Sequence, residues 1–417
     1  MPTAPGPYPR LAAPRLREAL ADTPAVLIHG PRQSGKTTLA RLVGEPKGYR
    51  YLSFDDDAVL TAAHRDPVGF VGGLPARVIL DEVQRAPEIF TTLKAAIDAR
   101  RSPGRFILTG SANVLLLPRL ADSLAGRMGL VRLHPLSLCE LERRPARFID
   151  ALLSGRFKTR VTEPLGPELL ARVVAGGYPA ALKRRTMARQ AAWYRDYVET
   201  LVQRDVRDLS RIHSLDALPR LLSVAAGHTA SLINIADLAS PFQLTRQTIH
   251  DHVTLLERVF LLERLPAWHA NQLSRLVKRP KLHIGDTGVA CALLGIDKRA
   301  LVADRTLLGP LLETFVFQEL RRQATARSQA VEFFHFRDRD NFEVDIVLEQ
   351  GRAAVAGVEV KAAASVRDAD LRGLRRLRDA VGPRFKCGVV LYDGTATIPF
   401  GDNLFAVPLR RLWEAEA

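Results

Sequence analysis

The sequence predicts an α/β protein of several domains, with a helical region in the middle of the chain. Three observations indicate this class. Short apolar runs alternate with polar loops in the first third, as in a parallel sheet covered by helices. Apolar residues at helical spacing dominate the middle, and a helical pattern followed by two strand-like runs fills the last third. The chain has 417 residues, 47% of them hydrophobic and 25% charged, which supports more than one buried core and excludes a disordered protein.

Several classes of protein are excluded early. The chain has no apolar run long enough for a transmembrane helix, so we expect no membrane partner. Residues 1–10 are rich in proline and lack the apolar segment of a secretion signal. The cysteines Cys139, Cys291 and Cys387 stand far apart, without metal-site or disulfide spacing. We therefore expect a protein of the reducing cytoplasm.

The positive charge is concentrated in the middle of the chain. The whole sequence carries a formal net charge of +15. Residues 141–300 hold 25 basic and 15 acidic side chains, compared with 18 and 13 in residues 1–140 and 17 of each in residues 301–417. Such an excess indicates a polyanion as partner, and DNA is the first candidate. Arginine enrichment from a GC-rich genome is the alternative, since only 10 of the 60 basic residues are lysine.

A complete phosphate-binding motif, G-P-R-Q-S-G-K-T, follows the apolar run at 25–29 and opens a helical stretch at 38–43. Its glycines allow backbone amides to surround phosphate oxygens at a helix N-terminus. Lys36 is expected to reach the β- and γ-phosphates of ATP, and the Thr37 hydroxyl to bind Mg²⁺. The predicted nucleotide-binding residues are Gly30, Pro31, Arg32, Gln33, Ser34, Gly35, Lys36, Thr37 and Thr38.

An acidic pair ends the next clear apolar run, at 78–80. Asp81 is expected to hold the metal ion, and Glu82 to orient or deprotonate the attacking water. Taken alone, the pair could also cap a helix. After a phosphate-binding loop, however, the pattern favours ATP hydrolysis over mere ATP binding.

Two further polar positions are candidates for the same site. Ser111 follows the apolar run at 106–109 and is our first choice for sensing the γ-phosphate, ahead of Thr109 and Asn113; a plain Gly-Ser turn is the alternative. Arg127 is a candidate arginine finger for a neighbouring active site in a homo-oligomer, although most arginines simply face solvent. Residues 51–54 are expected to add a strand to the sheet.

The segments 30–37, 78–82 and 108–111 together resemble an AAA+ ATPase module. The stretches DEVQRAP (81–87) and SLAGR…LHPLSLCE (123–140) are similar, more narrowly, to one prokaryotic family that joins such an ATPase to a C-terminal domain of unknown function. The resemblance extends over about residues 11–405. It implies a P-loop AAA+ ATPase domain at 1–140, with ATP and Mg²⁺ as cofactors.

The middle of the chain predicts a helical region at 141–225 and a winged helix-turn-helix at 226–300. A short helix at 235–239, a breaker, a longer helix at 244–256 and two strand-like runs at 259–262 and 281–284 follow the winged-helix order. The start of the longer helix is expected to contact DNA. Winged helices also bind proteins, which is the alternative. The predicted nucleic-acid residues are Thr245, Arg246, Gln247 and Thr248.

The last third, 301–417, resembles the α/β core of the PD-(D/E)xK nucleases. Glu313 lies in a helical pattern, Asp345 in a strand-like run, and Glu359 and Lys361 two residues apart in the next run, hence on one face. The resemblance implies that Asp345, Glu359 and Glu313 bind a metal ion and that Lys361 polarises the attacking water. A relic domain that has lost this chemistry is the alternative.

These observations predict a cytoplasmic, Mg²⁺-dependent AAA+ ATPase that acts on or senses DNA, with metal-dependent nuclease activity left open. Two alternatives remain. One is an ATP-gated regulator or scaffold that does not cut DNA. The other is a STAND-type switch whose partner is a protein.

Overall fold

The computed structural model describes residues 6–110, 124, 126–203, 217–242, 244–271, 273, 275 and 278–414. The chain forms two compact units. The first comprises Met1–Leu136 with Arg258–Phe260, and the second comprises Ser137–Glu257 with Leu261–Ala417. The four domains predicted from the sequence divide the chain more finely, and those boundaries stay predictions. No helix in the described ranges is both long and apolar enough to span a membrane.

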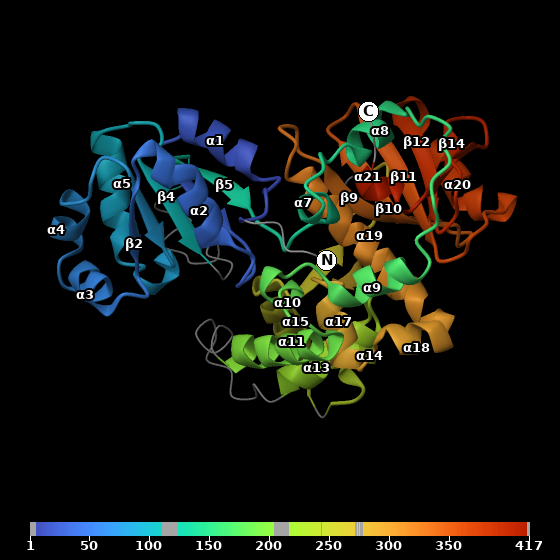
Figure 1. Ribbon diagram of the computed structural model, residues 1–417, viewed down its shortest axis with the longest axis horizontal. Helices are drawn as coiled ribbons and strands as arrows, with labels where there is room; N and C mark the ends of the chain where they lie inside the picture. The colour runs from blue at the N-terminus through green and yellow to red at the C-terminus, as the bar shows by residue number, and fades with distance from the viewer. Residues whose placement is uncertain are drawn as a thin grey trace. The chain divides into compact units, whose positions relative to one another are not determined.

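The first unit is a parallel sheet with helices on both faces (Figure 1). Its strand order is β2-β3-β4-β1-β5, and every neighbouring pair is parallel. The strands are β1 (Ala25–His29), β2 (Arg50–Ser53), β3 (Val78–Asp81), β4 (Phe106–Gly110) and β5 (Met128–Arg132). The helices are α1 (Ala13–Asp22), α2 (Lys36–Gly44), α3 (Asp57–Arg65), α4 (Pro67–Gly72) and α5 (Ile89–Ala99). The predicted parallel α/β fold of this region is confirmed.

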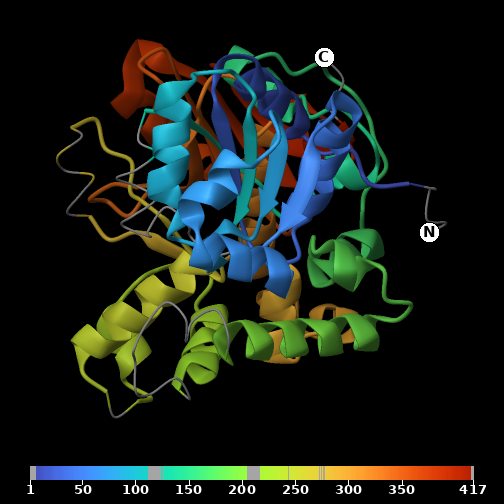
Figure 2. The same cartoon turned by 90° about the vertical axis from the view of Figure 1, so that its left-hand side faces the viewer.

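Successive strand residues supply two separate cores, because side chains of a strand alternate between the faces of the sheet. Leu27 and Leu80 pack with α3, α4 and α5, whereas Val26 and Ile79 pack with α1 and α2. Figure 2 shows α5 lying along one face of the strands. Burial on both faces explains why the central strands read as unbroken apolar runs. The edge strand β5 is partly exposed and contains glycine and arginine, so the apolar pattern did not predict it.

The first part of the second unit is helical. Its helices include α11, whose buried side carries Tyr194, Tyr197, Val198 and Leu201 at the i, i+3, i+4, i+7 spacing of an amphipathic helix. The bounds are α7 (Leu138–Leu141), α8 (Phe148–Ser154), α9 (Pro167–Ala175), α10 (Pro179–Leu182), α11 (Met187–Leu201) and α13 (Ala217–Gly227).

A small antiparallel sheet, in the order β6-β8-β7, follows these helices. It lies near α14 and α15 in the sequence, in the order expected for a winged helix, although the first wing strand begins at Leu262 and not at 259. The winged-helix assignment itself stays a prediction. The bounds are β6 (Ser231–Leu232), α14 (Ile235–Ala239), α15 (Arg246–Arg258), β7 (Leu262–Leu265), β8 (Lys281–Ile284), α17 (Thr287–Leu294) and α18 (Lys298–Ala303).

The C-terminal part is built on a mixed six-stranded sheet in the order β13-β14-β12-β11-β10-β9. Strands β9, β10 and β11 form an antiparallel meander, and β11, β12 and β14 run parallel to one another. Helix α20 packs on the core formed by Val344, Val347 and Val355. The bounds are α19 (Leu308–Ala324), β9 (Glu332–Arg337), β10 (Glu343–Gln350), β11 (Ala354–Lys361), α20 (Arg372–Val381), β12 (Phe385–Tyr392), β13 (Ile398–Pro399), β14 (Leu404–Pro408) and α21 (Arg411–Glu414).

Strand β10 contains a bulge. Its pairing with β9 shifts register between Val344 and Val347, so two residues of β10, Asp345 and Ile346, lie opposite a single residue of β9. Val344 and Val347 both contribute to the α20 core. A bulge re-aims a side chain relative to regular alternation, and here it separates Asp345 from the apolar face of the sheet.

Candidate functional site

The phosphate-binding loop runs from the end of β1 to the first turn of α2, as the motif predicts. Gly30 has φ +153°, and a Cβ there would lie 2.0 Å from the Leu133 carbonyl oxygen, so the loop passes directly against the chain after β5. Gly35, the residue before α2, has φ +97°, a conformation that side chains rarely adopt. Glycine is therefore required at both positions by backbone geometry.

Lys36 is turned into the loop. Its ammonium donates hydrogen bonds to the carbonyl oxygens of Gly30, at 3.1 Å, and Pro31, at 2.9 Å. The side chain is buried, at 5% exposure. A buried ammonium needs acceptors, and in this arrangement the loop supplies them from its own backbone. Phosphate oxygens would be stronger acceptors for the same group.

The carboxylate of Asp81 is the centre of a group of hydroxyls. It accepts hydrogen bonds from Thr37 Oγ1 at 2.9 Å and from the Tyr51 hydroxyl at 2.8 Å, and a further one from Thr109 Oγ1. The structure thus brings together Thr37 and Asp81, the two residues predicted to hold Mg²⁺. Tyr51 was not predicted to belong to this site.

Glu82 adopts an uncommon backbone conformation. Its φ of +57° lies in the left-handed region, which non-glycine residues seldom enter. Its backbone N–H donates to Thr109 Oγ1 at 3.2 Å, and its carboxylate accepts a hydrogen bond from Gln84 Nε2. Residues in such conformations cluster at functional sites. Thr109 therefore connects both members of the acidic pair.

Arg10 supports the loop from outside, which sequence analysis missed. Its guanidinium donates to the carbonyl oxygen of Ser34 at 2.6 Å and to that of His134 at 2.6 Å. The partners lie 24 and 124 residues away in sequence, so no local pattern could show them.

At the end of β1, burial and the nearby charges of Arg132 and Lys36 lower the pKa of His29 to about 4. That ring is therefore neutral at neutral pH.

Two other predicted residues of this site have different outcomes. Ser111 lies outside the described residues, as does Asn113. Arg127 forms a two-pronged ion pair with Asp98, with N–O distances of 2.7 and 2.9 Å. Its role as an arginine finger stays a prediction.

The predicted nucleic-acid residues lie at the start of α15. Thr245, Arg246 and Gln247 are exposed, and Thr248 is half-buried. Thr245 Oγ1 accepts from the Thr248 backbone N–H at 3.1 Å and so caps the helix. Gln247 Nε2 donates a hydrogen bond to Asp251 Oδ1 at 2.9 Å. Arg246 is exposed and has no carboxylate partner in the part of the chain that the structure describes.

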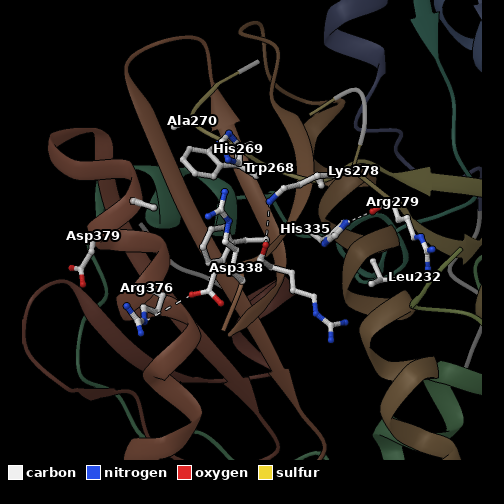
Figure 3. A pocket seen from close by; sticks show the side chains of 15 residues that line it. Leu232, Trp268, His269, Ala270, Lys278, Arg279, His335, Asp338, Arg376 and Asp379 are labelled. Carbon is white, nitrogen blue, oxygen red and sulfur yellow. Dashed lines mark hydrogen bonds and ion pairs between the residues drawn. The ribbon is translucent and has the colours of Figure 1, made fainter. Parts of the chain in front are cut away.

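A cleft of about 780 Å³ in the second unit is rich in cations (Figure 3). Arg376 pairs with Asp338 at 3.9 Å, and Lys278 reaches the Arg337 carbonyl oxygen at 3.4 Å. Arg279 and Arg339 are exposed and have no carboxylate partner within the described ranges. The basic side chains that line the cleft are Lys278, Arg279, Arg337, Arg339 and Arg376, against the carboxylates of Asp338 and Asp379.

Two of the residues predicted to form a C-terminal metal site, Glu313 and Asp345, lie beside a lysine. Lys281 Nζ lies 2.8 Å from Glu313 Oε1, 2.5 Å from Glu343 Oε1 and 3.3 Å from Asp345 Oδ1. We call Glu313, Glu343 and Asp345 the acidic cluster. Neither Lys281 nor Glu343 was predicted to belong here. The described part of the chain holds no group of three His, Cys, Asp or Glu side chains that could hold a metal ion.

Glu359 and Lys361 form a separate pair beside the acidic cluster. Lys361 Nζ lies 2.9 Å from Glu359 Oε1, as expected for residues on one face of β11. It is also 4.0 Å from Asp370 Oδ1. Asp345 is held elsewhere: its Oδ2 accepts from the Val360 backbone N–H at 2.9 Å.

The pKa shifts follow from burial and from the crowding of carboxyl groups. Burial, and then the charge of Asp345, raises the pKa of Glu359 to about 8, against the opposing effect of Lys361. The same two causes raise the pKa of Glu313 well above its usual range. Burial alone would lower the pKa of Lys281, but the charges of Glu313, Asp345 and Glu343 reverse this and raise it. Lys281 is therefore charged at neutral pH.

Three family descriptions match this chain. The family described as AAA domain matches residues 22–142, which contain the phosphate-binding loop, Asp81 and Glu82. Two domains of unknown function, DUF8612 and DUF4143, match residues 167–300 and 308–412. The AAA match confirms the predicted ATPase domain.

The chain is similar to curated and solved proteins. Uncharacterized protein Rv2008c of Mycobacterium tuberculosis and Uncharacterized protein Mb2031c of Mycobacterium bovis are each 31% identical over 402 residues, which cover 96% of this chain and 83% of the relative. Among solved structures, the Walker-type ATPase paby2304 of Pyrococcus abyssi is 16% identical with a TM-score of 0.43, covering 70% of this chain and 99% of that one. The Thermotoga maritima RuvB Holliday junction branch migration motor is 19% identical with a TM-score of 0.30, covering 61% and 89%. By its identity with the mycobacterial proteins over nearly its whole length, the chain belongs to their family, and its N-terminal domain is an ATP-binding ATPase domain of the AAA type.

Proposed function

We propose that this protein hydrolyses ATP with Mg²⁺ in the cytoplasm and that it binds DNA through the basic surface of its second unit, so that ATP turnover responds to DNA. The ATPase part rests on the loop 30–38, Asp81 and Glu82. The DNA part rests on one observation: residues 141–300 carry 25 basic and only 15 acidic side chains, and Arg246 and Arg279 among them are exposed.

Each residue of the ATPase site has a distinct task in this proposal. The backbone amides of the loop and the Lys36 ammonium bind the phosphates, and Lys36 exchanges its two carbonyl acceptors for phosphate oxygens. Thr37 and Asp81 offer the hard oxygen ligands that suit Mg²⁺, which supplies neutralisation of phosphate charge when it is bound. Glu82 accepts a proton from the attacking water. Gln84 and Thr109 hold Glu82 in position.

The γ-phosphate contacts are completed by Ser111 and, in a homo-oligomer, by Arg127 of a neighbouring subunit. For this role Arg127 has to exchange Asp98 for a phosphate, since both are anions that fit a guanidinium.

The DNA part is supported by where three exposed cations lie that have no carboxylate partner among the described residues. Arg246 is exposed at the start of α15, and Arg279 and Arg339 lie at the cleft of Figure 3. Arginine and helix N-termini are suited to phosphate groups. Residues 301–417 have no net charge, so the affinity has to come mainly from 141–300, where the excess of basic residues is found.

The test is the ATPase rate of the full chain with and without single-stranded, duplex and branched DNA. We expect turnover to rise with at least one of these forms, and the Lys36→Ala variant sets the background rate. Turnover that ignores every form of DNA but rises with a protein partner would support the STAND-type alternative and contradict the proposal.

A further inference from the structure

Lys281 occupies the centre of the acidic cluster. The distances from its Nζ to oxygens of Glu313, Glu343 and Asp345 are 2.8, 2.5 and 3.3 Å, and the side chain is only 3% exposed. Two of these carboxylates, Glu313 and Asp345, belong to the set that the nuclease resemblance assigns to a metal ion. The ammonium thus fills the position from which a metal ion would contact both of them.

An ammonium and a divalent cation cannot share this position. Mg²⁺ needs its oxygen ligands at about 2.0–2.1 Å in near-octahedral geometry. A metal ion bound to Glu313 and Asp345 would therefore lie within a few ångströms of Lys281 Nζ, and the two cations would repel each other strongly in a buried place. Binding of the metal requires that Lys281 leave.

Lys281 is firmly held where it is. It begins β8, the middle strand of its sheet, and is paired with Leu232 of β6 on one side and with Leu265 of β7 on the other. The backbone of Lys281 is therefore fixed by a neighbouring strand on each edge, and its ammonium is held by the three carboxylates.

The rest of β8 is joined to α19, the helix that carries Glu313. His283 Nδ1 lies 3.0 Å from Thr314 Oγ1, and the Ile284 carbonyl oxygen accepts from Gln318 Nε2 at 3.1 Å. Lys281, His283 and Ile284 thus each have a polar partner on α19. The ion pairs of Lys281 are part of a continuous joint between β8 and α19.

We propose that Lys281 is the resident cation of the acidic cluster in place of a divalent metal ion. While β8 is in place, Glu313, Asp345 and Glu359 bind no Mg²⁺, and the cluster fastens β8 to the C-terminal sheet. Glu359 takes no metal ion either, because its Oε1 already lies 2.9 Å from the Lys361 ammonium. This inference concerns the C-terminal part of the chain and does not depend on the proposed ATP or DNA chemistry.

In the first experiment, the full chain is titrated with Mn²⁺ in the absence of nucleotide, and the heat of binding is measured by isothermal titration calorimetry. Metal bound elsewhere is recognised by comparison with Asp345→Asn, which removes one carboxylate of the cluster. We expect identical isotherms for the wild type and Asp345→Asn. A site that is present in the wild type and lost in Asp345→Asn would overturn the proposal.

The second experiment removes the internal cation. Lys281→Gln removes the charge and shortens the side chain by one atom, and we expect it to gain one Mn²⁺ site that disappears again in Lys281→Gln/Asp345→Asn. Lys278→Gln, which removes a nearby lysine outside the cluster, should gain none. A folded Lys281→Gln protein that gains no site would contradict the proposal.

A third measurement needs no variant, in case Lys281→Gln fails to fold. Lysine side chains of the wild type are labelled with an amine reagent and read by mass spectrometry, with and without Mn²⁺. Lys281 should stay unlabelled in both conditions, with half-buried Lys278 labelled as the internal control. Labelling of Lys281 that begins when Mn²⁺ is added would show that the metal displaces it and would refute the inference.

Discussion

Asp81 shows how one carboxylate organises the ATPase site at the scale of single residues. It accepts hydrogen bonds from hydroxyls on three other segments: Thr37 after the loop, Tyr51 on β2 and Thr109 on β4. Because hydroxyls can rotate and serve as both donors and acceptors, they can turn to other partners when a ligand arrives. The carboxylate stays in a defined position in the meantime.

Lys36 and Glu82 should be separable by experiment. Lys36→Ala removes the buried ammonium that is poised at the loop, and we expect ATP binding to fall below detection. Glu82→Gln preserves the shape of the side chain and removes its basicity. ATP should therefore bind with an affinity within about twofold of the wild type, and the rate of ATP hydrolysis should fall by about 100-fold or more. Equilibrium binding of a fluorescent ATP analogue and steady-state phosphate release measure the two effects. Equal loss of binding in both variants would contradict the separate roles.

At the scale of elements, sequence predicted the parts of the site that are continuous and missed those that depend on tertiary contacts. The loop 30–37 and the pair Asp81 and Glu82 were predictable because motif and strand adjoin in the chain. Tyr51 and Arg10 were not, since nothing local distinguishes a tyrosine on an apolar strand or an arginine before the first helix. Their roles come from the strand order β2-β3 and from the approach of the segment after β5.

In the C-terminal region, too, the sequence predicted the helices and strands but not the tertiary contacts between them. The helix predicted around Glu313 and the two strands predicted around Asp345 and Glu359 are present as α19, β10 and β11, and Glu359 and Lys361 share a face as expected. Alternation could not reveal the bulge at Asp345. It also could not reveal that a lysine 32 residues before Glu313 and 64 before Asp345 would lie between them.

Strand β9 carries a histidine that should make the second unit sensitive to acid. Burial lowers the pKa of His335 to about 4; the nearby ammonium of Lys281 acts in the same direction, and the bond to the Arg279 carbonyl oxygen and the charge of Glu343 oppose it. In the unfolded chain the pKa is about 6.5. The folded state thus binds fewer protons between these values, so stability is complete above about pH 6.5 and is lost as the pH falls towards 4.

The expected size of this effect is about 1.4 kcal/mol per pH unit within that window. His335→Gln cannot titrate, so the pH dependence of its unfolding free energy should be weaker by about that amount. Urea unfolding at pH 7 and at pH 5 measures the difference, with His269→Gln at the neighbouring cleft as control. A His335→Gln protein with the same pH dependence as the wild type would show that the ring is not buried as a neutral group.

At the scale of the whole molecule, the distribution of charge matters more than its sum. The ATPase region and the C-terminal region carry net charges of +5 and 0, whereas 141–300 carries +10. Long-range attraction of a polyanion is therefore focused on the second unit. Ion pairs such as those of Lys281 and Arg127 neutralise cations within the protein. In the proposed DNA complex, counterions would be released mainly by exposed cations that have no carboxylate partner among the described residues, such as Arg246, Arg279 and Arg339.

This distribution leads to a quantitative prediction for salt dependence. If binding is mainly phosphate neutralisation, the logarithm of DNA affinity falls linearly with the logarithm of salt concentration, with a slope of about −0.9 for each duplex phosphate neutralised. Arg246→Ala should lower affinity for all sequences and make the slope shallower by about 0.9 if Arg246 contacts a phosphate. If it reads a base instead, the loss should depend on sequence.

Arg375→Ala is the matched control, because Arg375 is already paired with Asp368 and its removal should leave the slope unchanged. Fluorescence anisotropy across a salt series measures these slopes, and an affinity that does not change with salt would exclude phosphate neutralisation as the basis of binding.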